Sequence, residues 1–288
     1  MIAFEYRTPG SLEEVYADLK ELGSDGKVIA GGTALVIMMK QQLVQPSCVI
    51  SLRNVAGLSA LSEEKGNIHI GGLVSHAALD ASALVQGKLP MLGETYHHVA
   101  TQRVRTMATV GGGLAHADPN QDPPPSFIAL GASFKLSSAG GTRSVAAEDF
   151  FSDYYETALE PEEIVSGVSV PLLGPDSGAA YLKFLPRSAD DYATVSAAAV
   201  VTLDVNKTTI QDVHIAMGSV NATPVRATAS EDVLRGQPVK PEGLREAGEK
   251  AKEHTDPVSD FRGSGSYKTQ MAAVFVRRAL EQAIANVA

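Results

Sequence analysis

The chain has one cysteine, Cys48, and no tryptophan among its 288 residues. A single cysteine excludes an intramolecular disulfide. It also excludes an iron–sulfur cluster held by this chain alone, because such clusters take several thiolate ligands. So little cysteine is typical of a reducing compartment, and we expect a cytoplasmic protein.

Long hydrophobic runs and an excess of basic charge are also missing. The longest apolar stretch surrounds residues 197–201, far short of the ~20 residues that cross a bilayer. The opening MIAFEYRTPG lacks the succession of basic, apolar and small residues that marks a secretory signal. Lysine and arginine number 24 against 33 acidic residues, a net charge of −9. We therefore expect no membrane span and no nucleic-acid partner.

Several catalytic and nucleotide-binding motifs are absent. The sequence contains no G-x-G-x-x-G, no G-x-x-x-x-G-K-[ST] and no G-x-S-x-G, which argues against a Rossmann site, a P-loop and a serine hydrolase. Cys48 has no obvious base partner. His97, His98 and His116 lack a carboxylate or cysteine at metal-ligand spacing. We therefore expect neither a metal site nor catalytic side chains on this chain.

The apolar patterns that are present predict an α+β protein. Alternating and buried-type strands are interspersed with capped helices up to a linker at residues 172–178. Beyond it, three predicted antiparallel strands are followed by helices at 226–235, 241–253 and 267–288. Serine-capped helices are expected at 11–23 and 75–85, and a proline-led helix at 123–130.

Runs of glycine stand out in VIAGGTAL (residues 28–35) and TVGGGLAHADPNQD (residues 109–122). Consecutive glycines suit close approach of the backbone to a bound group, or positive φ. Free N–H groups at a helix start favour an anion. We hypothesise that the two stretches are loops that face each other across one diphosphate. A tight turn into a core helix is the alternative for residues 28–35. The pair Gly71–Gly72 is interpreted as a structural turn at a strand end.

Three single residues have two interpretations each. Asp122 either accepts hydrogen bonds from a ribose or caps the next helix. Lys183 either meets an anionic or electron-rich ligand or extends to water. Tyr192 either packs on an aromatic cofactor ring or belongs to the core.

Seven blocks resemble, in order, the FAD-binding medium subunit of the molybdenum hydroxylases, the carbon monoxide dehydrogenase and xanthine dehydrogenase flavoprotein family. The blocks are FEYRTPGSLEEV, IAGGTAL, SLRNVAGL, IHIGGLVSH, RVRTMATVGGGLAHADPNQDPP, LEPEEIVSGVSVP and YLKFLPRSADDYATVSAAA. Together they span nearly the whole chain.

The resemblance implies a two-lobed FAD-binding domain of the vanillyl-alcohol-oxidase (PCMH) type at 1–175, with lobes at about 1–55 and 56–175. A C-terminal flavoprotein domain would occupy 176–288. It implies FAD on this chain. It also implies two partner subunits, a large one with molybdopterin and a small one with two [2Fe–2S] clusters, in a dimer of heterotrimers. The chain would pass electrons from those clusters to an external acceptor.

The family's cofactor contacts match seventeen positions of this sequence. They are Ala30, Gly31, Gly32, Thr33, Ala34 and Leu35 in the first turn, Thr109, Val110, Gly111, Gly112 and Gly113 in the second, Asp122, and the flavin-side residues Val99, Ala100, Val165, Lys183 and Tyr192.

Two departures from the family pattern leave alternatives open. Thr33 and Ala34 replace a His–Ser pair, and Gly113 stands where asparagine is usual. The alternatives are a self-contained FAD-dependent oxidoreductase with its own substrate pocket and a non-catalytic scaffold that has lost FAD.

Overall fold

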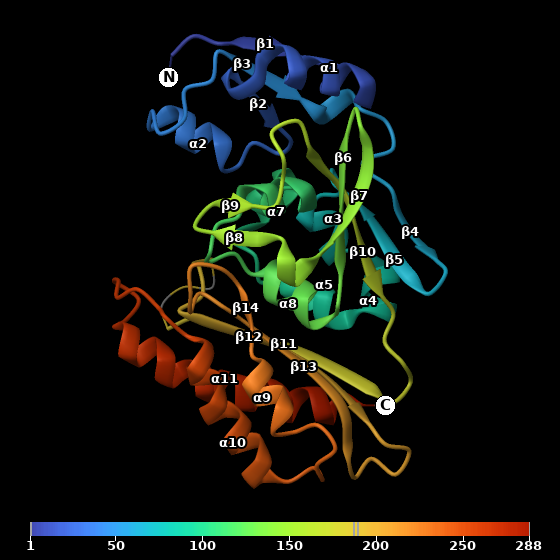
Figure 1. The fold of residues 1–288 in the computed structure, drawn as a ribbon, viewed down its shortest axis with the longest axis vertical. Helices are drawn as coiled ribbons and strands as arrows, with labels where there is room; N and C mark the ends of the chain where they lie inside the picture. The colour runs from blue at the N-terminus through green and yellow to red at the C-terminus, as the bar shows by residue number, and fades with distance from the viewer. Residues whose placement is uncertain (1, 187, 189, 288) are drawn as a thin grey trace.

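The computed structural model describes residues 2–186, 188 and 190–287. Figure 1 shows an N-terminal lobe, a central lobe and a C-terminal domain following one another along the long axis. Each is built around a sheet of its own. The α+β fold class is confirmed.

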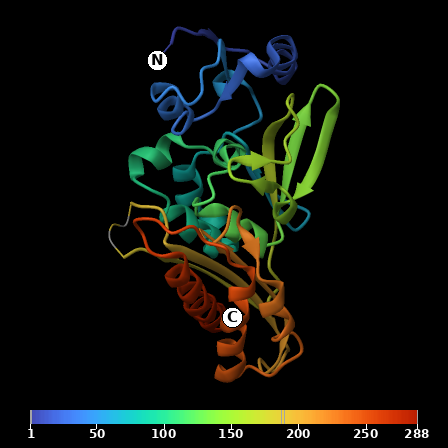
Figure 2. The ribbon, with the colours of Figure 1, turned by 60° about the vertical axis from the view of Figure 1, so that its left-hand side comes forward.

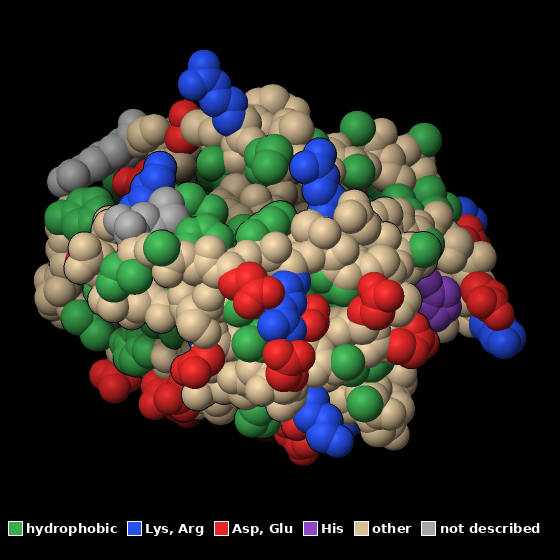
Figure 3. Space-filling model, turned by 90° about the horizontal axis from the view of Figure 1, so that it is seen from above, with side chains coloured by type: hydrophobic (Ala, Val, Ile, Leu, Met, Phe, Trp, Pro, Cys, Tyr) green, Lys and Arg blue, Asp and Glu red, His purple; other side chains and the backbone are tan. Residues whose placement is uncertain are grey.

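The N-terminal lobe is a three-stranded parallel sheet, in the order β1-β3-β2, covered by α1. Ser11 caps α1 by accepting from the Glu14 N–H, and the Glu14 carboxylate accepts from the Gly10 N–H at 2.6 Å, which fixes the predicted helix start. Its elements are β1 (Glu5–Arg7), α1 (Leu12–Leu22), β2 (Gly26–Ile29), α2 (Leu35–Lys40) and β3 (Cys48–Ser51). In the view onto this end of the molecule, basic, acidic and hydrophobic side chains are interspersed (Figure 3).

The central lobe has a five-stranded antiparallel sheet in the order β4-β5-β10-β6-β7. Its strands are β4 (Leu61–Glu64), β5 (Asn67–Gly71), β6 (Ser133–Ser138), β7 (Gly141–Ala146) and β10 (Ile164–Pro171), with the small pair β8 (Phe151–Asp153) and β9 (Glu156–Thr157). Its helices are α3 (His76–Asp80), α4 (Ala83–Lys88), α5 (Pro90–His97), α6 (Gln102–Met107), α7 (Val110–His116) and α8 (Pro123–Ala129).

The C-terminal domain has the antiparallel sheet β11-β12-β13-β14. Its elements are β11 (Ser177–Phe184), β12 (Val195–Leu203), β13 (Ile210–Gly218), β14 (Val225–Arg226), α9 (Thr228–Asp232), α10 (Pro241–Ala251) and α11 (Gly265–Ala285). The sheet is buried on both faces. Along β12, Ala198 and Val200 join the core of the central lobe, while Ala197, Ala199 and Val201 pack in the core that holds α11. Figure 2 shows α11 on the face turned away from the central lobe.

Two local predictions were wrong, and two elements were missed. The helix expected at 75–85 is two helices, because Ser82 accepts from the Val85 N–H and starts α4 anew. Helix α6 and strand β4 were not predicted. The glycine run 111–113 lies within helix α7 and not in a loop, because Thr109 caps it by accepting from the Gly112 N–H at 3.2 Å.

Candidate functional site

The first glycine turn (residues 30–35) and the stretch called here the second turn (residues 109–113, which begin helix α7) lie against each other in the structure. A Cβ on Gly31 would collide with the carbonyl of Met107, the last residue of α6. A Cβ on Gly112 would lie 3.4 Å from the Ala30 Cβ and 2.8 Å from Thr109 Oγ1. Glycine is therefore needed at position 31 so that the two stretches of backbone can pack together.

The two turns differ in the hydrogen bonds that their N–H groups make. Within the described residues, the N–H groups of residues 31–34 donate to no acceptor. In the second turn, Gly111 N–H donates to the Gly72 carbonyl, Gly112 N–H to Thr109 Oγ1 and Gly113 N–H to the Thr109 carbonyl. Free donors are thus concentrated in the first turn, and the hypothesis that both stretches donate backbone N–H groups to a diphosphate needs correction for residues 111–113.

Positive φ explains only one of the glycines in the two turns. Gly32 has φ = 73°, where glycine is favoured, but the glycines of α7 have ordinary right-handed helical backbone. Gly111 is needed for a different reason. A Cβ there would meet the Val165 carbonyl at 2.7 Å and the Gly72 Cα at 2.9 Å. Val165 and the Gly71–Gly72 turn therefore lie directly behind the second turn. This is the structural role that was predicted for Gly71–Gly72.

Asp122 and Lys183 bind each other. Lys183 Nζ donates to Asp122 Oδ2 at 2.8 Å, and Tyr181 OH donates to Asp122 Oδ1 at 2.7 Å. The side chains of Asp122 and Lys183 are 4% and 2% exposed. Burial raises the pKa of the Asp122 carboxyl, and Lys183 and Tyr181 offset part of that rise. Asp122 stands at the start of α8 but makes no capping bond, and Lys183 does not extend to water.

Val99 and Ala100 follow α5 and lie beside this ion pair. The Lys183 ammonium also donates to the carbonyl of His98, at 2.9 Å. Tyr192 lies on the surface with 41% of its area exposed, and the Arg262 guanidinium lies 5.7 Å from its ring centre. It is therefore not a core tyrosine. Burial of the hydroxyl and the nearby Asp118 carboxylate raise the pKa of Tyr192.

Sequence reasoning missed a polar cluster at Asp118. Tyr155 OH donates to Asp118 Oδ2 at 3.3 Å, and the Tyr155 and His116 ring centres are 5.3 Å apart. Asp118 and His116 lie inside the motif that follows the glycine run, but Tyr155 comes from the turn between β8 and β9. Nothing in the sequence pattern indicated that Tyr155 would join them.

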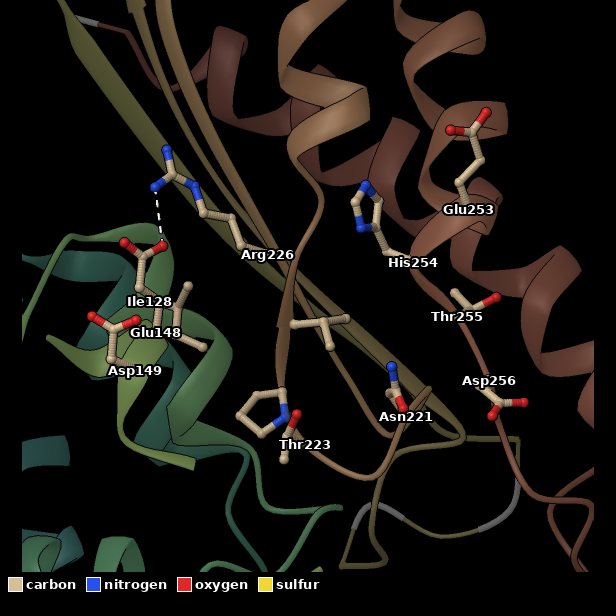
Figure 4. A pocket seen from close by; sticks show the side chains of 12 residues that line it. Ile128, Glu148, Asp149, Asn221, Thr223, Arg226, Glu253, His254, Thr255 and Asp256 are labelled. Atoms are coloured by element: carbon tan, nitrogen blue, oxygen red, sulfur yellow. Dashed lines mark hydrogen bonds and ion pairs between the residues drawn. The ribbon is translucent and has the colours of Figure 1, made fainter. Parts of the chain in front are cut away.

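A cavity of about 470 Å³ lies elsewhere, between the central lobe and the C-terminal domain (Figure 4). Glu148 and Asp149 line it from the central lobe, and Arg226 and His254 from the C-terminal domain. Arg226 is paired with Glu148 at 3.0 Å, and His254 Nε2 accepts from the Ala229 N–H. None of the predicted site residues lines this cavity.

Among the described residues, no group of three or more His, Cys, Asp and Glu side chains is placed to hold a metal ion. No helix in the described ranges combines the length and apolarity that crossing a membrane requires. Cys48 is buried, and burial raises the pKa of its thiol.

Comparison with known proteins gives two family matches. Residues 2–173 match the FAD binding domain in molybdopterin dehydrogenase, and residues 180–283 match the CO dehydrogenase flavoprotein C-terminal domain. The chain is 36% identical to the carbon monoxide dehydrogenase medium chain of Afipia carboxidovorans, over 99% of this chain and 98% of that one. It is 34% identical to the nicotine 6-hydroxylase medium subunit of Paenarthrobacter nicotinovorans, over 98% and 97%.

Solved structures agree with these matches over the full length. Carbon monoxide dehydrogenase from Hydrogenophaga pseudoflava superposes with a TM-score of 0.96 at 38% identity, covering 100% of both chains. Quinoline 2-oxidoreductase from Pseudomonas putida 86 gives 0.92 at 34% identity, covering 99% of this chain and 98% of that one. The cofactor of this chain is FAD, and the chain is part of an oxidoreductase. It belongs to the family of FAD-binding medium subunits of the molybdenum hydroxylases.

Proposed function

We propose that this chain is the electron-transfer subunit of a heterotrimeric molybdenum hydroxylase. It would take electrons from the iron–sulfur clusters of a partner subunit and pass them to an external acceptor. The observation that carries the proposal is the run of free N–H groups at residues 31–34, placed where the second glycine turn lies against the first. Successive free N–H groups in a turn form a concave anion site, which suits a diphosphate.

The proposed FAD site is assembled from segments that are far apart in the chain. The free N–H groups of residues 31–34 would hold the diphosphate, and residues 109–113 would border the site from the second turn. Asp122 and Lys183 join the central lobe to the C-terminal domain, and the Lys183 ammonium also holds the carbonyl of His98, next to Val99 and Ala100. Val99 and Ala100 would hold the flavin ring, with Val165 behind the second turn and Tyr192 at the surface.

The residues present fit this assignment. Bound FAD supplies the redox chemistry, so the chain needs no acid or base of its own. What the chain supplies is donors for the diphosphate, a buried ion pair that joins two lobes, and an exposed aromatic edge at Tyr192. A side chain at Gly113 would reach two polar neighbours, since its Cβ would lie 3.5 Å from His76 Nε2 and 3.6 Å from Gln121 Oε1.

We further propose the composition of the complex. A large molybdopterin subunit and a small subunit with two [2Fe–2S] clusters would join this chain in a dimer of heterotrimers in the cytoplasm. The support is the single buried cysteine, which leaves no thiolate set for a cluster here, and the medium-chain relatives. We also propose domain limits of 1–175, with lobes of about 1–55 and 56–175, and 176–288, since each part is built around one main sheet.

The test is a flavin titration of the purified full-length chain. We expect a yellow protein, or a colourless one that quenches the fluorescence of added FAD with a one-to-one end point. A colourless chain that ignores added FAD would contradict the proposal. Partner dependence is tested next. We expect no turnover of substrate by the isolated chain with an electron acceptor, and turnover would favour a self-contained oxidoreductase instead.

A further inference from the structure

Three consecutive backbone carbonyls after α5 are held by two cationic side chains. Arg105 Nη1 donates to the carbonyls of Val99 at 2.9 Å and Ala100 at 2.8 Å. Lys183 Nζ donates to the carbonyl of His98 at 2.9 Å. Ala100 has φ = 40°, a left-handed conformation that a non-glycine residue adopts only when its surroundings hold it there.

The Arg105 guanidinium is itself fixed. Its Nη2 donates to Gln102 Oε1 at 3.0 Å, and its Nε lies 3.7 Å from Asp80 Oδ2. The side chain is only 11% exposed. Arg103, two positions earlier on the same helix α6, is exposed. Of the two arginines, Arg105 alone is directed into the protein, toward the turn at residues 99–100.

These hydrogen bonds to the carbonyls of residues 98–100 determine the direction of the neighbouring N–H groups. In a trans peptide the N–H lies opposite the carbonyl. Because the carbonyls of Val99 and Ala100 face Arg105, the N–H groups of Ala100 and Thr101 face away from it. Neither N–H donates to an acceptor within the described residues. A cation bound to a carbonyl also polarises its peptide group and strengthens the N–H as a donor.

We propose that Arg105 is a positioning residue that presents the N–H groups of Ala100 and Thr101 as a pair of donors to an electron-rich edge of the flavin ring. This rests on the proposed function, which places the ring along Val99 and Ala100. Reduction adds electron density to the ring, so fixed donors stabilise the reduced ring more than the oxidised one. Arg105 therefore raises the reduction potential of the flavin without touching it.

The experiment compares full-length variants that have been loaded with FAD. Arg105→Gln removes the cation and Arg103→Gln is the matched control on the same helix. Arg105→Lys keeps the charge but loses the planar fork that joins the carbonyls to Gln102 and Asp80. The readouts are FAD content, thermal unfolding and the midpoint potential against a reference dye.

We expect Arg105→Gln to disfavour the reduced flavin by about tenfold, which is a shift of about 30 mV to more negative potential for a two-electron couple. Arg105→Lys should shift it less in the same direction, and Arg103→Gln should not shift it. A wild-type potential in a folded, FAD-loaded Arg105→Gln protein overturns the inference, even if thermal stability falls. If that variant does not fold, a wild-type potential in Arg105→Lys overturns it. Wild-type chain that holds no FAD contradicts the proposed function instead.

Discussion

The carboxylate of Asp122 and the ammonium of Lys183 lie 2.8 Å apart although 61 positions separate them in the chain. Asp122 belongs to the central lobe, at the start of α8, and Lys183 to β11 of the C-terminal domain. Both are almost fully buried, and Tyr181 occupies the second carboxylate oxygen. The pair joins the two domains beside the turn that we propose for the flavin ring.

Removing one member of this pair should destabilise the fold strongly. Asp122→Asn leaves Lys183 buried without a counter-ion, which costs about 3–5 kcal/mol in the free energy of unfolding. Lys183→Met leaves the buried Asp122 carboxylate without a counter-ion and should cost a similar amount. Urea unfolding of both variants and of the double variant Asp122→Asn/Lys183→Met measures the coupling. Costs that simply add would show that the two side chains do not act as a pair.

Two glycine-to-valine variants should separate folding from flavin binding. Gly72→Val places a Cβ against the Val165 carbonyl and should lower thermal stability severely. Gly112→Val places a Cβ 2.8 Å from Thr109 Oγ1, at the face turned to Ala30, and should abolish FAD binding. Flavin content and unfolding temperature are measured on both. Full flavin in Gly112→Val would refute the assignment of the second turn.

Smaller substitutions test the contact between the two turns. Gly31→Ala should prevent the turns from packing, because its methyl group collides with the Met107 carbonyl. Gly87→Ala is the control, since Gly87 lies in α4 outside the proposed FAD site and a methyl group there points into open space. We expect loss of stability and of FAD affinity in the first variant only. Equal behaviour of the two variants would mean that the turns do not pack as described.

His76 should make the fold sensitive to mild acid. Burial lowers the pKa of His76 from 6.5 to about 4, so the folded protein binds its proton less readily than the unfolded chain. The contribution to stability is present above pH 6.5 and is lost as pH falls to 4, about 3 kcal/mol in total. His76→Phe keeps a ring against Tyr96, whose ring centre is 4.9 Å away, and should flatten this part of the pH profile.

The control for that profile is His97, which is exposed and pairs with Asp80 at 3.2 Å. His97→Gln should retain the steep loss of stability between pH 6.5 and 4. Unfolding by urea at a series of pH values measures the slope. The same slope in wild type and in His76→Phe would contradict the assignment to His76.

Local chemistry explains what could be predicted. Ser11 and Glu14 start α1, Ser75 starts α3 and the prolines after Asp122 start α8, because caps and proline act through neighbouring backbone groups. The apolar run of β12 likewise indicated a strand. The resemblance of seven sequence blocks identified the family, and the family matches confirm it.

The sequence alone therefore determined the fold class, the starts of the capped helices and the first glycine turn, because these depend on residues close together in the chain. Tertiary structure decided the rest. Three glycines disfavour a helix by about 1 kcal/mol each, yet α7 forms because Thr109 caps it and because Gly111 packs on Gly72 and Val165. Burial turned Asp122 and Lys183 from two separate candidates into one ion pair, since neither charge is stable alone away from water.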